Sequence, residues 1–169
     1  MNGCSHDVDS IRHLKSNIEA IHERNQAALV WEYPQEPLPI VTDNRKLRQI
    51  VQNLISNAIK FTDHGKITVS VQTVSRSPNL PLFDSELNGQ NGLDQWLEIK
   101  VRDTGRGILT DKLDTFFDKF YQLDNSETRL CGGLGLGLYI AKKFTELLGG
   151  KITVKSEISE RSTFTVAIP

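Results

Sequence analysis

The chain has 169 residues, of which 38% are hydrophobic, and its 20 Lys and Arg nearly balance its 21 Asp and Glu, for a net charge of −1. This predicts one globular domain with a sizeable core and excludes a general nucleic-acid-binding surface, which needs a clear excess of Lys and Arg. The two cysteines, Cys4 and Cys131, suggest neither a disulfide framework nor a zinc site, and no apolar run approaches the ~20 residues of a membrane span. We expect a cytoplasmic domain without direct membrane contact, whether or not the intact protein is anchored in a membrane.

The first half of the chain predicts a helix, a strand and a longer helix. Apolar residues at three- and four-residue spacings indicate an amphipathic helix over residues 8–27, and residues 28–33 read as a strand closed by a proline cluster. Asp43 can cap the next helix, which we expect to end at the Asp63-His-Gly65 turn. A sustained 3.6-residue apolar stripe marks this helix, formed by Leu47, Ile50, Val51, Leu54, Ile55, Ala58 and Ile59.

The second half predicts four strands and one further helix. The strands are expected over residues 66–74, 95–102, 151–156 and 163–168. Residues 75–94 read as an exposed, mobile loop insertion, and a helix over 134–148 is stopped by Gly149-Gly150. We therefore expect one domain over 1–169 of the α/β class, a two-layer α/β sandwich whose mixed five-stranded sheet carries about three helices on one face.

Polar side chains share one face of the long predicted helix. Asn53, Asn57 and Lys60 stand at i, i+4 and i+7. A solvated face is the plain alternative, but Asn competes for backbone hydrogen bonds and is a poor residue in the middle of a helix. Two amide oxygens one turn apart suit a hard cation such as Mg²⁺, and a lysine one turn further on can meet a phosphate.

Asp103 ends a predicted strand and leads into Thr104-Gly-Arg-Gly107. A carboxylate held there can accept a hydrogen bond from the exocyclic amine of adenine, and the glycines let the backbone approach the base closely. The competing interpretation is the Asp-Thr-Gly triplet of aspartic proteases, which need two aspartates that share a proton. No second Asp-Thr-Gly or Asp-Ser-Gly occurs in the chain, and a homodimeric protease with one triplet per chain would leave the other motifs unexplained. A nucleotide site is therefore favoured.

A glycine-rich run, Gly132-Gly-Leu-Gly-Leu-Gly137, precedes the last predicted helix. Free N–H groups and the positive end of the helix would converge there on an anion, although a flexible glycine loop is the plain alternative. The spacing is not that of a Rossmann fingerprint, and no Gly-Lys-Ser/Thr follows as in a Walker P-loop. We interpret the run as a phosphate cradle.

An aromatic pair, Phe117 and Phe120, lies between these segments at the spacing of a half-buried helical turn. Residues 124–133 have the charged, glycine-ended composition of a mobile lid. Lys119 and Arg129 are the cations that could reach a γ-phosphate from this region.

In this order the four segments resemble the N, G1, F and G2 boxes of the catalytic ATP-binding domain of sensor histidine kinases, a branch of the GHKL or Bergerat-fold ATPases. The resemblance runs over about residues 8–169. It implies ATP and Mg²⁺ as cofactors, with Asn57 as the metal ligand, Asn53 ordering metal-bound water or phosphate, and Asn53, Lys60, Lys119 and Arg129 acting in catalysis. The residues that it assigns to nucleotide binding are Asn53, Asn57, Lys60, Asp103, Gly105, Gly107, Ile108, Gly133, Leu134, Gly135, Leu136, Gly137, Leu138 and Thr163.

Three features of the sequence differ from the family's pattern. Leu134 stands where a Thr is common, which removes one hydroxyl contact and leaves the backbone cradle intact. The run Ser159-Glu-Arg-Ser-Thr163 stands where a Gly usually precedes Ser-Thr-Phe, and Thr163 is expected to reach the adenine-binding water. The insertion at 75–94 exceeds the connection that the family usually has.

The resemblance implies transfer of the ATP γ-phosphoryl group to a histidine on a separate dimerisation domain, and a response-regulator receiver domain as the downstream partner. No histidine here has the acceptor context: His6 lacks the Leu-Arg-Thr-Pro continuation and lies too near Asn53 for a helical hairpin to intervene. The phosphoacceptor domain is thus expected to be absent. Two alternatives stay open, a GHKL-type ATPase, which would need Glu at the position of Asn53, and a non-catalytic nucleotide-binding module that regulates a partner.

Overall fold

The computed structural model describes residues 26–34, 41–75, 95–109, 116–117, 136–158 and 160–169. Residues 8–25 of the helix expected over 8–27, nearly all of the insertion at 75–94 and the lid at 124–133 lie outside the described residues. Gln26 and Ala27, the last two residues expected in that helix, belong to a strand instead. No helix in the described part of the chain is both long and apolar enough to cross a bilayer.

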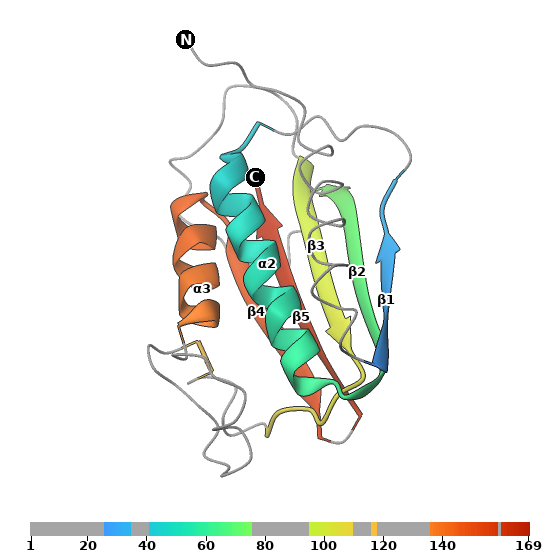
Figure 1. Ribbon diagram of the computed structural model, residues 1–169. Coiled ribbons are helices and arrows are strands. Elements are labelled where there is room, and N and C mark those ends of the chain that lie inside the picture. Colours follow the sequence, from blue (N-terminus) through green and yellow to red (C-terminus); the bar gives the residue numbers. More distant parts are fainter. Residues whose placement is uncertain (1–25, 35–40, 76–94, 110–115, 118–135, 159) are drawn as a thin grey trace.

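Five strands form one mixed sheet in the order β1-β2-β3-β5-β4 (Figure 1). They are β1 (Gln26–Glu32), β2 (His64–Ser75), β3 (Gln95–Asp103), β4 (Lys151–Glu157) and β5 (Arg161–Ile168). The pairing of β1 with β2 is parallel, and the other three pairings are antiparallel. The predicted mixed five-stranded sheet is confirmed, with strand ends that differ by one or two residues from those expected.

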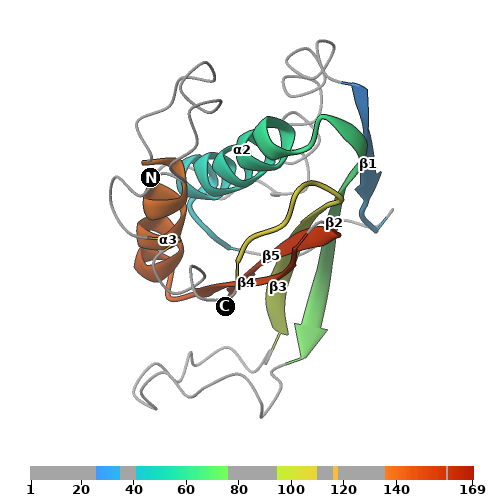
Figure 2. The same cartoon turned by 90° about the horizontal axis from the view of Figure 1, so that it is seen from below.

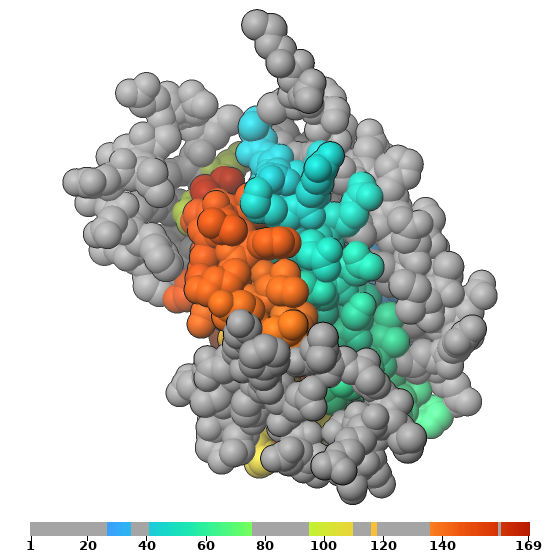
Figure 3. All heavy atoms as spheres, turned by 60° about the vertical axis from the view of Figure 1, so that its left-hand side comes forward, coloured from blue at the N-terminus to red at the C-terminus, as the bar shows by residue number. Residues whose placement is uncertain are grey.

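In the part of the chain that the structure describes, two helices, α2 (Asn44–Phe61) and α3 (Gly137–Leu147), cover the same face of the sheet (Figure 2). They contact each other, and in the space-filling view their side chains form one continuous surface (Figure 3). The two-layer α/β sandwich is therefore confirmed. The third helix expected at the N-terminus falls almost entirely on residues that the structure does not describe.

The start of α2 depends on Asp43, as its sequence predicts. The Asp43 carboxylate accepts hydrogen bonds from the backbone N–H groups of Arg45, at 2.9 Å, and Lys46, at 3.1 Å. These bonds satisfy donors that the first turn of a helix leaves free. The helix ends at Phe61, slightly before the expected turn, because residues from His64 onward already pair with β1.

The core lies between the helical layer and the sheet. The predicted stripe of α2 is confirmed, since its buried residues are Leu47, Ile50, Val51, Leu54, Ile55 and Ala58. On β2, buried Ile67, Val69 and Val71 alternate with half-buried Thr68 and Ser70, so one face of the strand meets the helices. The same alternation on β3 and β5 decides which polar side chains reach the helical side of the sheet.

Candidate functional site

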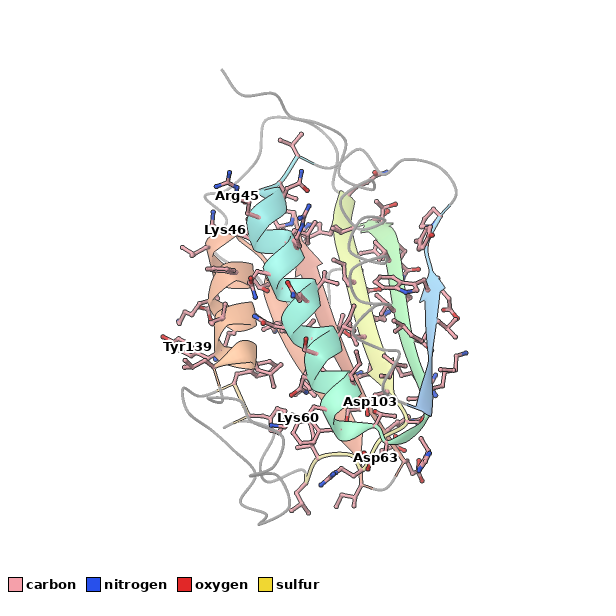
Figure 4. The ribbon with its side chains drawn as sticks, viewed as in Figure 1. Arg45, Lys46, Lys60, Asp63, Asp103 and Tyr139 are labelled. Atoms are coloured by element: carbon pink, nitrogen blue, oxygen red, sulfur yellow. The ribbon has the colours of Figure 1, made fainter. Side chains whose placement is uncertain are left out.

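A pocket opens where the C-terminal half of α2 meets the ends of β3 and β5. It is lined by Asn57, Phe61, Asp103, Gly107, Ile108, Phe116, Ser162 and Phe164. Figure 4 shows Asp103 and Lys60 at this same end of the sandwich. The fold thus brings together a face of α2, the loop after β3 and the start of β5, which are far apart in the sequence.

Asp103, the last residue of β3, is a buried carboxylate with 3% of its surface exposed. Its Oδ1 accepts the N–H of Gly105 at 3.0 Å, and the N–H of Ser162 also donates to the carboxylate. Burial raises the pKa of Asp103 above its ordinary value, and these two N–H donors hold part of the rise back. Within the described residues no cation pairs with it, and a buried carboxylate of this kind in a pocket is typical of functional sites.

Glycines bring the loop after β3 close to two other backbones. A Cβ on Gly105 would lie 2.3 Å from the carbonyl oxygen of Phe61, and one on Gly107 would lie 2.2 Å from that of Glu157. Gly107 also has φ of 68°, in the left-handed region that favours glycine. The sequence analysis expected these glycines to let the backbone approach the base, but in the structure they let the loop approach the chain's own backbone. The loop thereby forms the pocket wall that carries Gly107 and Ile108.

The polar face of α2 runs from the pocket toward the start of α3. Asn57 lines the pocket, and its side chain makes no hydrogen bond to another described residue. One turn earlier, Asn53 accepts a hydrogen bond from Gln49 Nε2 at 3.2 Å, while its buried Nδ2 has no partner in the described part of the chain. A Cβ on Gly137 would lie 3.7 Å from Asn53 Oδ1, so the end of the glycine-rich run lies beside this face.

Two cations flank Phe61, whose ring lines the pocket. Lys60 Nζ lies 5.4 Å from the ring centroid, and the guanidinium carbon of Arg106 lies 5.7 Å from it. Both distances are within the range of a cation–π interaction. Two cationic side chains therefore lie beside a residue that lines the pocket, where a phosphate-bearing ligand could meet them.

Aromatic rings close the other side of the pocket. Phe116 and Phe117 are buried, with ring centroids 6.2 Å and 6.3 Å from that of Phe164 on β5. Phe117 was expected as an anchor, whereas Phe116, Phe61 and Phe164 were missed. Phe120, the other expected anchor, lies outside the described residues.

The structure does not bring Thr163 into the pocket. Its neighbours Ser162 and Phe164 line the pocket instead, and a strand sends successive side chains to opposite faces. Ser162 pairs directly with Asp103 in the β3–β5 register. The apolar residues Phe164, Val166 and Ile168 alternate along β5, and Ser162 is two residues before the first of them. This pattern in the sequence would have placed Ser162 on their face of the strand.

The remaining predicted residues fall in two groups. Leu136 precedes α3 as its N-cap without a side-chain cap, and Leu138 is buried in the first turn. Five others lie outside the described residues, namely Lys119, Arg129, Gly133, Leu134 and Gly135. Of the helix expected over 134–148, the structure describes residues from Leu136 onward, and α3 covers Gly137–Leu147.

Comparison with known proteins identifies the family of this chain. Residues 42–169 match the family described as "Histidine kinase-, DNA gyrase B-, and HSP90-like ATPase". Histidine kinase 5 of Arabidopsis thaliana is 43% identical over 140 residues, which cover 79% of this chain and 15% of that protein. The chain belongs to this ATPase family, as an ATP-binding catalytic domain of the sensor histidine kinase type.

Solved structures show the same fold. The catalytic domain of histidine kinase ThkA superposes with a TM-score of 0.74 at 22% identity, over 98% of this chain and 93% of that one. Full-length ShkA, solved in complex with AMPPNP, gives 0.72 at 24% identity, over 95% of this chain and 29% of that one. The chain spans only 7% to 18% of the length of the curated relatives that it matches.

Proposed function

We propose that this domain binds ATP with Mg²⁺ in the pocket at Asp103 and delivers the γ-phosphoryl group to a histidine on a separate dimerisation domain of the same kinase. The observation that carries the proposal is the buried Asp103 carboxylate, without a cation partner among the described residues, in a pocket that Asn57 also lines. A carboxylate in that position accepts a hydrogen bond from the adenine amine, which compensates part of the cost of its burial.

The donors present fit Mg²⁺. In the described part of the chain no group of three or more His, Cys, Asp or Glu side chains could hold a metal ion. Mg²⁺ needs no such cage, because it commonly takes one or two protein oxygens together with substrate phosphates and water. The Asn57 amide oxygen, in the pocket and without a hydrogen bond to another described residue, would hold it. When bound, the ion neutralises charge on the phosphates.

The chain's own residues contribute positioning and charge. Lys60 and the start of α3, which has no side-chain cap and lies beside Asn53, support the triphosphate. Lys119 and Arg129 are the candidate cations for the γ-phosphate. Transfer forms a bond from a histidine nitrogen to the γ-phosphorus and breaks the bond from that phosphorus to the bridging oxygen, with ADP as the leaving group.

The partners follow from this chemistry. The acceptor histidine comes from the dimerisation domain, and a response-regulator receiver domain then takes the phosphoryl group. We place the domain in the cytoplasm, where ATP is available. The match to histidine kinases supports these proposals. Those kinases are much longer than this chain, which covers 15% of one and 7% of another, so they have room for further domains.

Calorimetry with and without Mg²⁺ tests the binding site. Asp103→Asn should lower the ATP affinity by about 5- to 150-fold, since an amide donor facing the adenine amine leaves a mismatch worth ~1–3 kcal/mol. Asn57→Ala should weaken binding mainly when Mg²⁺ is present. Ser56→Ala is the matched control, because Ser56 is exposed on the same helix. Equal affinity of wild type and Asp103→Asn would contradict the site.

Phosphotransfer from γ-labelled ATP tests the reaction. The chain alone should remain unlabelled, and acid-labile label should appear on the dimerisation domain of the same kinase when it is added. Transfer in trans should be slow, because separation forfeits the effective concentration that tethering provides. Label on His6 of the chain alone, abolished by His6→Gln, would refute the assignment as a donor domain.

A further inference from the structure

Ser156 on β4 links two walls of the pocket without lining it. Its Oγ accepts the backbone N–H of Ile108 at 2.8 Å, donates to the carbonyl oxygen of Arg161 at 3.0 Å, and lies 2.9 Å from the Oγ of Ser162. Ile108 and Ser162 both line the pocket, and Ser162 stands opposite Ser156 in the β4–β5 register. One half-buried hydroxyl therefore connects the loop after β3 to the start of β5.

The direction of these hydrogen bonds follows from the groups involved. An N–H can only donate and a carbonyl oxygen can only accept, so Ser156 accepts from Ile108 and gives its single proton to Arg161. All three contacts of Ser156 can be hydrogen bonds at the same time only when Ser162 donates in the contact between the two hydroxyls, and we take this arrangement. The one proton of Ser162 is used there, and only its lone pairs remain for the pocket.

On the β3–β5 side of the pocket, the side chains of Ser162 and Asp103 consequently offer acceptors, whereas Asn57 on α2 also carries amide donors. Ser162 presents lone pairs, and the adjacent Asp103 carboxylate accepts hydrogen bonds when ionised. An adenine edge carries a donor, the N6 amine, whereas guanine carries an acceptor, O6, at the equivalent position. At the position of N6 in adenine and O6 in guanine, the Ser162 and Asp103 acceptors fit the adenine amine, directly or through a water, and oppose the guanine oxygen.

We propose that Ser156 is a positioning residue for base selectivity: it holds Ser162 as a hydrogen-bond acceptor and so favours adenine over guanine nucleotides. This inference rests on the proposed nucleotide site. Loss of the Ser156 hydroxyl would let the Ser162 proton rotate toward the pocket, where it could donate to guanine O6. The selectivity is thus decided by a side chain that does not touch the base.

Calorimetric titration with ATP and GTP tests the proposal, with the ratio of the two affinities as the readout. We expect Ser156→Ala to reduce the ATP-to-GTP affinity ratio roughly tenfold, the size of one hydrogen bond's contribution. Ser156→Thr keeps a hydroxyl on a β-branched side chain suited to a strand and should restore the ratio. Thr153→Ala is the matched control, since Thr153 is exposed on the same strand and its hydroxyl should not affect the ratio.

A double-mutant cycle separates positioning from a merely structural effect. Because Ser156 acts through Ser162, Ser156→Ala should change the ratio little when Ser162 is already Ala. Ser162→Ala alone must also reduce the ratio, which keeps the proposal falsifiable if Ser156→Ala does not fold.

The outcomes distinguish this inference from the proposed function. An unchanged ratio in folded Ser156→Ala, or in Ser162→Ala, would overturn the role of Ser156 and leave the ATP site standing. Absence of ATP binding in the wild-type chain would overturn both.

Discussion

Alanine at position 107 would test how the loop after β3 forms the pocket. Gly107 has φ of 68°, and a Cβ there would lie 2.2 Å from the carbonyl oxygen of Glu157 and 2.9 Å from the Cα of Ile158. Both neighbouring atoms belong to backbone and cannot rotate away. Either the loop or the β4–β5 hairpin must therefore move, and Gly107 itself lines the pocket.

Gly149 supplies a matched control. Its φ is 73°, but a Cβ there would meet only the side chain of Pro169, at an ordinary distance of 3.5 Å. Gly149→Ala should therefore lose only about 1–2 kcal/mol of unfolding free energy, the cost of a left-handed conformation for an L-residue. Gly107→Ala carries the same cost and a further 1–3 kcal/mol, roughly, for overpacking against backbone.

Urea unfolding of the two variants measures the stability difference, from the midpoint and slope of each transition. Calorimetry with ATP measures the effect on the pocket. We expect Gly107→Ala to be the less stable variant and to bind ATP more weakly, while Gly149→Ala binds as wild type does. Equal stability losses with unchanged ATP affinity in both variants would refute the reasoning.

Three further predictions follow from the described residues. Burial raises the pKa of Asp103, and only the ionised carboxylate accepts the hydrogen bond from adenine. The ATP affinity should therefore fall as the pH drops through this raised pKa, at a higher pH than for an ordinary aspartate. The raised pKa also means that the ionised Asp103 destabilises the nucleotide-free fold at neutral pH, and that acidification removes this destabilisation. The same pH titration of Asp103→Asn is the control, because it contains the protonation of the nucleotide but not that of Asp103. Identical pH profiles of ATP affinity for the two proteins would count against the prediction. Thr163→Ala should leave ATP affinity within about twofold of wild type, well inside one hydrogen bond's contribution, whereas Ser162→Ala weakens it; the reverse order in calorimetry would place Thr163 at the base. Leu54, on the buried face of α2, has 0% of its surface exposed. Leu54→Ala should therefore lose about 2–5 kcal/mol of unfolding free energy in urea, and a loss below about 1 kcal/mol would contradict its place in the core.

Local patterns were enough to predict the elements of this fold. The apolar stripe of α2 and the alternation on β2 each report the environment of one helix or strand, because side-chain periodicity depends only on the local backbone. Residue chemistry likewise indicated the kind of site: amides on one helical face, a carboxylate at the end of a strand, and glycines before a helix.

Pairings between distant segments were decided only by the tertiary structure. The register that sets Asp103 opposite Ser162 sends Thr163 to the other face, and a shift of one residue reverses every side chain of a strand. The contact of Gly107 with Glu157 and the hydrogen bond from Ile108 to Ser156 likewise join residues about fifty positions apart. No periodicity within one segment encodes such contacts, because they depend on how the sheet and its loops pack together.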